Sequence, residues 1–153
     1  MSKTTGYTIQ DGYTTMPLRL SGNYPAKILF DGRFYDFKTE AHVSLLVYKH
    51  FPESLQHTVK SLFQDYITSH EIRLVSLDDE FRQVKKDSRA SIIQMCTVSG
   101  LKGFIDLLRQ KLNLDLELLP THVTLYVAGS SRGIGINSAE DLEKYTNTIE
   151  KPF

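Results

Sequence analysis

The sequence predicts an α+β protein whose strands form antiparallel sheets flanked by helices. The dipeptide Asp31-Gly32 separates two short strand-like runs and is typical of a β-hairpin turn. Segment 55–66 instead spaces its apolar residues by three and four positions, which predicts a helix with one buried face. Strand-like and helix-like segments then alternate, and the two halves of the chain resemble each other coarsely. We therefore expect a two-lobed α+β fold with a central cleft.

The expected elements follow from local signals along the chain. Residues 1–25 are rich in Thr, Gly and Tyr, a composition that predicts weak structure. The charged segment 78–87 is expected to connect two strands. Ser99 is a candidate N-cap, and Ser138 with Asp141 three residues later predicts the start of a short final helix. We expect strands at 26–30, 33–37, 41–48, 72–77, 90–98, 121–128 and 134–136, and helices at 53–67, 99–112 and after 138.

Length and charge restrict the class of ligand. The 153 residues predict one domain, 1–153, whose two lobes share a core. Lys and Arg together number 18, as do Asp and Glu, so the formal net charge is zero. Binding of duplex nucleic acid depends on many phosphate contacts, and a neutral chain is poorly suited to it. A small anion needs only a local positive site, so we expect a small or short ligand.

Cysteine content and the N-terminal sequence indicate the compartment. Cys96 is the single cysteine, so no intramolecular disulfide forms, and no Cys/His cluster has zinc spacing. We expect a buried, unreactive thiol and no metal or cofactor. Residues 1–12 lack the apolar core of a signal peptide, and no stretch approaches the roughly 20 apolar residues of a membrane span. These features predict a cytoplasmic protein without membrane contact, and they leave the oligomeric state open.

A short motif occurs twice and carries the functional hypothesis. His-Val-Ser-Leu at 42–45 recurs as His-Val-Thr-Leu at 122–125, whereas the three other histidines lack this pattern. In a strand, the histidine and the hydroxyl residue two positions later share one face, and the apolar residues occupy the other. The alternative is that two strand histidines simply bond to neighbouring hydroxyls. The repetition favours catalysis, with the candidate catalytic residues His42, Ser44, His122 and Thr124.

The paired motifs resemble those of the 2H phosphoesterase superfamily. Members of that superfamily carry two His-apolar-Ser/Thr-apolar motifs in a two-lobed α+β fold, and all eight motif positions match here. The size of the chain and its Tyr-rich N-terminal segment further resemble one branch, the phage anti-CBASS nucleases, which degrade the cyclic oligonucleotide signals of bacterial defence. That resemblance implies a cyclic di- or trinucleotide as the substrate and the cytoplasm of an infected bacterium as the location.

Two imidazoles and two hydroxyls suit phosphodiester cleavage without a metal. One neutral histidine takes the proton of a ribose 2′-OH, and the other, protonated, delivers a proton to the departing 5′ oxygen. Ser44 and Thr124 are donors for the non-bridging phosphate oxygens. Which histidine is the base, and which linkage is cleaved, stay open at this point.

Further residues are candidates for binding the substrate. Tyr126 follows the second motif by one strand repeat, so we expect it either to stack on a base or to end the core. Comparison with the anti-CBASS branch favours Tyr13 as a stacking residue within an N-terminal segment that closes over the ligand. Glu140 either stabilises the last helix through its dipole or accepts a hydrogen bond from the amino group of a base. Tyr145 is a second candidate for stacking on a base. The segment 131–135 is expected to be a hairpin connection, and the alternative is that Arg132 at its tip contacts a phosphate.

Two other functions fit the same motifs. The first is an RNA-processing 2′,3′-cyclic phosphodiesterase or a 2′–5′ oligoadenylate phosphodiesterase, which uses the same chemistry on another linkage. The second is a non-catalytic protein that sequesters nucleotides. A sequestering protein has no need of two acid/base histidines, so the intact motifs favour an enzyme.

Overall fold

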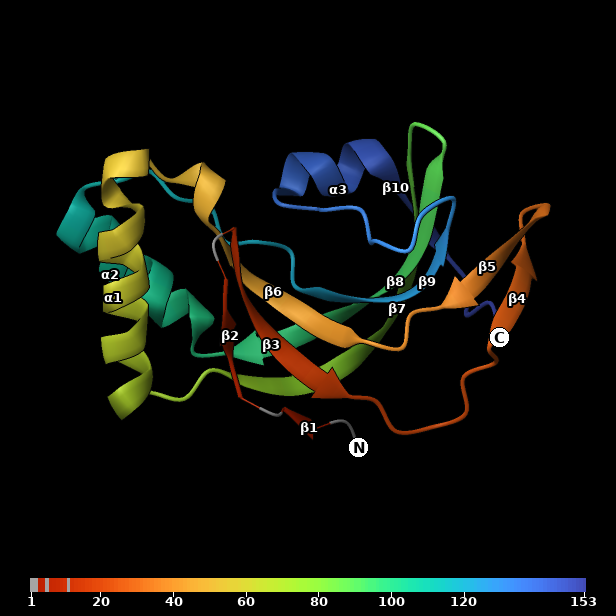
Figure 1. Ribbon diagram of the computed structural model, residues 1–153, viewed down its shortest axis with the longest axis horizontal. Coiled ribbons are helices and arrows are strands. Elements are labelled where there is room, and N and C mark those ends of the chain that lie inside the picture. Colours follow the sequence, from red (N-terminus) through yellow and green to blue (C-terminus); the bar gives the residue numbers. More distant parts are fainter. Residues whose placement is uncertain (1–2, 5, 11) are drawn as a thin grey trace.

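The computed structural model describes residues 3–4, 6–10 and 12–153 of the protein (Figure 1). Its helices are α1 (Glu53–Ser69), α2 (Leu101–Leu112) and α3 (Ala139–Tyr145), with a 3₁₀ turn, η1 (Tyr48–His50), before α1. Its strands are β1 (Lys3–Thr4), β2 (Thr8–Ile9), β3 (Tyr13–Arg19), β4 (Lys27–Phe30), β5 (Arg33–Phe37), β6 (Ala41–Val47), β7 (Arg73–Lys86), β8 (Arg89–Ser99), β9 (His122–Ala128) and β10 (Thr146–Ile149).

The strands form one continuous sheet in the described part of the chain. Its order is β1-β3-β6-β9-β8-β7-β10, while β2 pairs with β3 and the β4–β5 hairpin joins β9 through β5. All registered pairs are antiparallel. The predicted α+β class with antiparallel strands is therefore confirmed. The two strands that carry the repeated motif, β6 and β9, are neighbours in this sheet.

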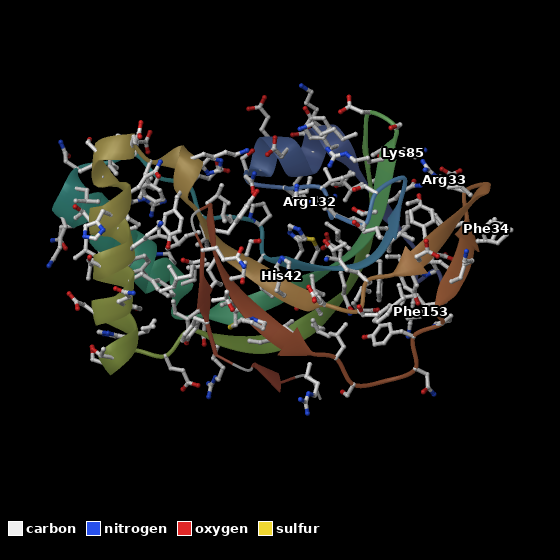
Figure 2. The ribbon with its side chains drawn as sticks, viewed as in Figure 1. Arg33, Phe34, His42, Lys85, Arg132 and Phe153 are labelled. Carbon is white, nitrogen blue, oxygen red and sulfur yellow. The ribbon has the colours of Figure 1, made fainter. Side chains whose placement is uncertain are left out.

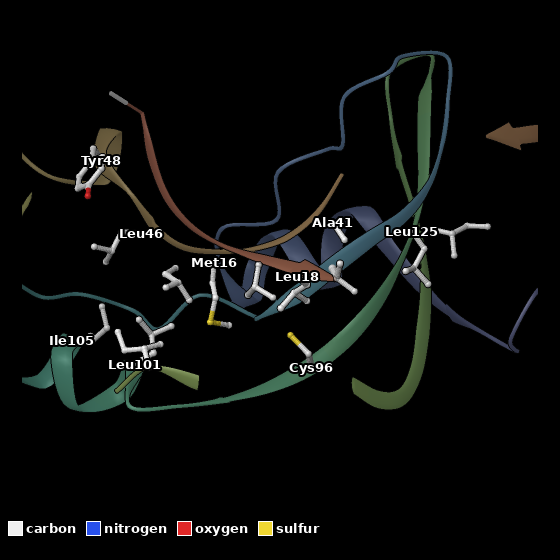
Figure 3. Close-up of a cluster of buried hydrophobic side chains, with 14 of the residues drawn as sticks. Met16, Leu18, Ala41, Leu46, Tyr48, Cys96, Leu101, Ile105 and Leu125 are labelled. Atoms are coloured by element: carbon white, nitrogen blue, oxygen red, sulfur yellow. The ribbon is translucent and has the colours of Figure 1, made fainter. Parts of the chain in front are cut away.

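Two hydrophobic cores lie on opposite faces of the sheet. The larger core contains Phe63 of α1 and Phe104 of α2, both fully buried. Figure 3 shows another part of this core, with Met16, Cys96 and Leu125 on the strands and Leu101 and Ile105 on α2. The smaller core lies beneath α3. Ile92 belongs to the larger core and its neighbour Ile93 to the smaller one, as the alternation of a strand requires. The smaller core consists of Val84, Ile93, Ile134 and Ile136, with Met95, Leu142 and Tyr145 packed against it.

Several local predictions are confirmed by the backbone. Asp31 and Gly32 have φ values of 51° and 78°, and both central residues of a type I′ hairpin turn require positive φ. The Ser138 hydroxyl accepts a hydrogen bond of 3.0 Å from the Asp141 amide, which caps α3. Helix α1 buries Val59 and Phe63 on its inner face, as the apolar spacing predicts.

Two predictions are wrong: the weak structure of residues 1–25, as far as these residues are described, and the loop at 78–87. Residues 1–2, 5 and 11 lie outside the described part of the chain. β3 is an inner strand, paired with β6 over Tyr13–Leu18, so the N-terminal segment contributes to the sheet. Strand β7 extends through residues 78–86, and the turn to β8 begins only at Asp87, where φ is 58°. The charged side chains of this segment are exposed or half-buried, whereas Phe81, Gln83 and Val84 between them are buried.

The start of α2, the segment 134–136 and the last strand also differ from expectation. Ser99 ends β8, and Gly100 takes the N-cap position of α2 with a φ of 90° and no side-chain cap bond. Residues 134–136 form an irregular segment rather than a strand, although Ile134 and Ile136 are buried. β10 was not predicted, and its pairing with β7 depends on the docking of α3.

Candidate active site

The two repeated motifs meet across one strand pair. Val43 of β6 registers with Val123 of β9 in antiparallel orientation. Antiparallel geometry then places His42 next to Thr124 and Ser44 next to His122, on the face opposite the two buried valines. The two histidines lie on the diagonal of this pair, where Cβ atoms are typically about 7–8 Å apart. One phosphate group fits between two imidazoles at that separation.

Both motif strands contain a β-bulge at the final leucine of the motif. β3 pairs its adjacent residues 14 and 15 with residues 46 and 44 of β6, so Leu45 is the extra residue. β8 likewise pairs adjacent residues 92 and 93 with residues 126 and 124 of β9, which leaves Leu125 as the extra residue. A bulge interrupts the two-residue alternation and redirects the side chains that follow. In each motif the histidine and the hydroxyl residue therefore lie on one face of the sheet, and the residue after the bulge, Leu46 or Tyr126, is buried in the core.

The second bulge explains why Tyr126 does not line the site. Its side chain is fully buried in the larger core, and its hydroxyl donates a 2.8 Å hydrogen bond to the carbonyl oxygen of Pro25. Its ring packs against Phe37 and Phe153, with centroid distances of 5.4 and 5.5 Å. Strict alternation would have placed it beside Thr124. The base-stacking hypothesis for Tyr126 is therefore wrong, and the alternative, a core aromatic, is correct.

A cavity of about 400 Å³ covers the motif face, and we call it the cleft. This volume lies in the range of small-molecule sites. The cleft is lined by the four motif side chains, by the β2–β3 turn and by the segment that follows β9. The lining includes Gln10, Tyr13, Lys38, Glu40, His42, Ser44, Pro120, His122, Thr124, Arg132, Gly133 and Asn137.

His122 is held in a defined tautomer. Its Nδ1 lies 2.9 Å from the carbonyl oxygen of Pro120, and a carbonyl only accepts, so Nδ1 carries the proton. The neutral ring therefore keeps its lone pair on Nε2. Burial lowers the pKa of His122 from its usual 6.5, the Pro120 bond opposes this shift, and the charge of protonated His42 lowers the pKa further. At neutral pH His122 is consequently a neutral imidazole with a free basic nitrogen.

His42 differs from His122 in its charged neighbours. Burial lowers its pKa from 6.5, the Lys38 ammonium lowers it further, and the Glu40 carboxylate raises it. The mutual effect of the two imidazoles means that one protonates at the expense of the other. A phosphate anion between them would favour protonation, since an opposite charge stabilises the imidazolium.

Two cations line the cleft without a described carboxylate partner. Neither Lys38 nor Arg132 forms an ion pair with any acidic side chain in the part of the chain that the structure describes. The Lys38 backbone is fixed, because its amide donates a 2.7 Å bond to the Leu125 carbonyl oxygen. In the view of Figure 2, Arg132 lies between His42 and α3. Arg132 lines the same cavity as the motif residues, and its contact with a phosphate stays a prediction.

The segment after β9 forms a close wall over Thr124. A Cβ on Gly133 would lie 3.0 Å from the Thr124 hydroxyl oxygen, so glycine allows this backbone to approach the second motif. The sequence motif Ser-Arg-Gly-Ile-Gly at 131–135 resembles a phosphate loop only superficially. Its observed role is to carry Arg132 and to cover the hydroxyl.

The N-terminal turn supplies the opposite wall. Tyr13, which is 45% exposed, and Gln10 both line the cleft. The Tyr48 amide donates a 3.0 Å bond to the Gly12 carbonyl oxygen, and the Tyr7 hydroxyl donates a 2.7 Å bond to the Ile72 carbonyl oxygen. Tyr13 therefore stays a candidate for stacking on a base. Hydrogen bonds of Tyr7 and Gly12 join this N-terminal segment to Ile72 and Tyr48. Residue 11 lies outside the described part of the chain.

Two predicted binding residues lie outside the cleft. Glu140 is exposed in the first turn of α3, where its negative charge interacts favourably with the positive end of the helix dipole. The Tyr145 ring packs on the smaller core and has the ammonium groups of Lys86 and Lys144 at 5.0 and 5.2 Å from its centroid. Neither side chain lines the cavity that contains the motifs. The predicted roles of Glu140 and Tyr145 as substrate-binding residues of the cleft are therefore wrong.

Sequence reasoning missed several residues that line the cleft, among them two charged and two amide side chains. Lys38 and Glu40 are brought there because β9 pairs first with β6 and then with β5, so the connection between those strands crosses the end of the motif face. Gln10 and Asn137 come from turns. The only sequence signal for Lys38 and Glu40 was their charge just before the first motif. No sequence pattern marks Gln10 and Asn137.

The remaining sequence expectations concern groups outside the motifs. Cys96 is buried, and burial raises the pKa of its thiol to about 12, as expected for an unreactive cysteine. In the described residues, no group of three or more His, Cys, Asp or Glu side chains is placed to hold a metal ion. None of the helices that the structure describes has the length and apolar character needed to cross a membrane.

Comparison of the chain with protein-family models, with curated proteins and with solved structures gave no match.

Proposed function

We propose that the protein is a metal-independent phosphodiesterase of the 2H type that cleaves 3′–5′ bonds in cyclic di- or trinucleotides. The observation that carries this proposal is the convergence of two imidazoles and two hydroxyls on one cavity from adjacent antiparallel strands. A pair of core histidines would not need a cavity above both rings, or two cations in its lining that have no carboxylate partner among the described residues.

The structure favours His122 as the general base of the first step. Its Nδ1 proton is held by Pro120, which directs the basic Nε2 away from that carbonyl, and burial keeps the ring neutral. Nε2 takes the proton of the ribose 2′-OH, and the 2′ oxygen forms a bond to phosphorus. The bond from phosphorus to the 5′ oxygen breaks, and protonated His42 gives its proton to that oxygen. The products are a 2′,3′-cyclic phosphate and a 5′-hydroxyl.

The second step reverses the two roles. His42, now neutral, takes a proton from water, and the water oxygen attacks the phosphorus of the cyclic phosphate. The protonated His122 then donates to the 2′ oxygen as the ring opens, which leaves a 3′ phosphate. Each histidine ends the cycle in its initial state, so the pair needs no other proton carrier.

Ser44 and Thr124 complete the arrangement around the phosphate. Each hydroxyl lies next to the histidine of the other motif, so each end of the site has one proton-transfer group and one donor. The hydroxyls donate to the non-bridging oxygens, whose negative charge grows in the transition state. Such donors, fixed on strands, need little reorganisation during the reaction.

The proposed substrate and setting rest on the resemblance to phage anti-CBASS nucleases together with the size and charge of the site. A confined cavity in a chain of zero net charge suits a small nucleotide better than a duplex. The proposed role is therefore the removal of cyclic oligonucleotide signals in the cytoplasm of an infected bacterium, which would evade CBASS immunity.

The decisive experiment is incubation of the protein with 3′,3′-cyclic GMP–AMP in EDTA, followed by chromatography of the products. We expect a linear product with a 3′ or 2′,3′-cyclic phosphate. His42→Ala and His122→Ala should each lower the rate by about 10²–10⁴-fold, the usual contribution of a general acid or base. The matched control is His57→Ala on the exposed side of α1, outside the cleft, which should keep wild-type turnover.

Other outcomes identify the alternatives. Near-normal turnover by either active-site variant would rule out the two-histidine mechanism. Cleavage only of a linear 2′–5′ oligoadenylate or a 2′,3′-cyclic phosphate would keep the chemistry and change the substrate. Recovery of the cyclic dinucleotide intact, bound in a one-to-one ratio, would identify a sequestering protein instead.

A further inference from the structure

A second cavity adjoins the cleft. It has a volume of about 640 Å³ and lies between segment 36–40 and the turn at 129–131, and we call it the outer groove. Lys38 and Glu40 line both the cleft and the outer groove. A molecule bound at the histidines can therefore continue past Lys38 into the outer groove.

The outer groove has a rigid frame. Asp36 pairs with Val127 in the sheet, and the Lys38 amide donates to the Leu125 carbonyl oxygen. On the other side, the Ser130 hydroxyl accepts a 3.1 Å bond from the Arg132 amide, which holds the turn that forms the opposite wall. Both walls are thus anchored to β9, the strand that carries the second motif. A ligand in the groove would be held in a fixed relation to His122.

Lys38 stands where the two cavities meet and has no acidic partner among the described residues. Its side chain is partly buried, and its charge influences His42. Glu40 lies at the same junction as Lys38, whereas Asp36 lines only the outer groove and is ion-paired with Lys27 at 3.4 Å. A phosphate is therefore favoured beside Lys38 and disfavoured beside the Glu40 carboxylate. Those carboxylates, with the hydroxyls of Ser130 and Ser131, instead suit the donors and acceptors of a ribose or a base.

We propose that the outer groove is a second nucleotide subsite, in which Lys38 binds the phosphodiester next to the one held between the two histidines. This inference rests on the proposed function and makes its substrate class more specific. The site would select molecules with at least two phosphodiester groups, and a nucleotide with a single phosphate would leave Lys38 unpaired.

The test compares two ligands that contain the same two nucleosides. Cyclic di-2′-deoxyadenosine monophosphate has two phosphodiesters, and the linear dinucleoside monophosphate d(ApA) has one. Both lack the attacking 2′-OH, so binding can be measured by calorimetry on the wild-type protein without turnover. We expect the cyclic ligand to bind at least about tenfold more tightly, because a hydrogen bond to a charged group contributes on that scale.

Substitutions at Lys38 then locate the second phosphate. Lys38→Gln should weaken the cyclic ligand by about tenfold and d(ApA) by less than about threefold, and Lys38→Arg should restore most of the affinity. Ser131→Glu, which adds a carboxylate to the far wall, should also weaken the cyclic ligand. Lys111→Gln on the exposed face of α2 is the matched loss of charge and should change neither affinity.

Equal weakening of both ligands in Lys38→Gln would place Lys38 on the scissile phosphate and overturn the subsite. Unchanged affinity in Lys38→Gln or in Ser131→Glu would overturn it as well. If neither ligand binds the wild-type protein, the subsite and the proposed function both fail. If the wild-type protein cleaves the cyclic dinucleotide while Lys38→Gln shows no selective loss, only the subsite fails.

Discussion

Gly100 offers a sharp test of the tertiary structure that supports the site. It lies between β8 and α2 with a φ of 90°, and its carbonyl oxygen accepts a 3.0 Å bond from the Tyr66 hydroxyl. A Cβ at this position would lie 2.4 Å from the Glu71 carbonyl oxygen and 3.2 Å from the Ile72 Cα. Both neighbours are backbone atoms of the chain that leads into β7, so no side chain can rotate to make room.

Gly32→Ala is the matched control, because Gly32 also has a positive φ of 78° but an added Cβ would have no neighbour within 4 Å. In the control, left-handed strain of about 1–2 kcal/mol is partly offset by about 0.4–1 kcal/mol from the stiffer unfolded chain. Gly100→Ala adds the clash, which costs about 1–3 kcal/mol when a packed structure must shift. We expect Gly100→Ala to lower the free energy of unfolding by about 2–4 kcal/mol and Gly32→Ala by about 1 kcal/mol.

Urea denaturation followed by far-UV circular dichroism measures both values, and equal m-values would show that the same cooperative transition is compared. The melting temperature of Gly100→Ala should be lower by about 2–4 °C for each kcal/mol of lost stability. Equal destabilisation by the two substitutions would refute the close approach of Gly100 to residues 71 and 72, and with it the packing of α2 against this part of the sheet.

Two further predictions concern the site itself. Both histidine pKa values lie below 6.5 in the free protein, so kcat/KM should fall as the pH rises above 6.5, because the general acid loses its proton. The alkaline limb of kcat should lie at higher pH, since bound phosphate raises the imidazolium pKa; a kcat/KM plateau up to pH 8 would contradict this. Gly133→Ala puts a Cβ 3.0 Å from the Thr124 hydroxyl oxygen, so kcat should fall by up to about tenfold with little change in KM. Unchanged kcat would show that the Thr124 hydroxyl has no role in the transition state.

Local sequence signals predicted the elements whose cause is itself local. The Asp31-Gly32 turn forms because its residues tolerate positive φ, and α1 forms because its apolar side chains recur on one helical face. The capping bond of Ser138 is a contact between residues three apart. The sharing of one face by His42 and Ser44, and by the corresponding pair in β9, follows from the geometry of a strand.

Long-range pairing decided the features that sequence reasoning missed. β10 exists because α3 returns the chain to the free edge of β7, and the charged end of β7 stays extended because β8 pairs with it. Edge and exposed strands need no clean apolar alternation, so their sequences resemble loops. The bulge at Leu125 follows from the register of β8 on β9, and it alone moves Tyr126 from the cleft into the core.

By itself, the sequence determined that this protein has two equivalent pairs of one imidazole and one hydroxyl, each on one face of a strand. Only the tertiary structure decided that the two pairs face one cavity, because the register of Val43 with Val123 joins segments far apart in the chain. The same holds for Lys38 and Arg132, which reach the cleft from a strand connection and a turn. Side-chain alternation depends on neighbouring residues, whereas register and cavity shape depend on the packing of the whole sheet.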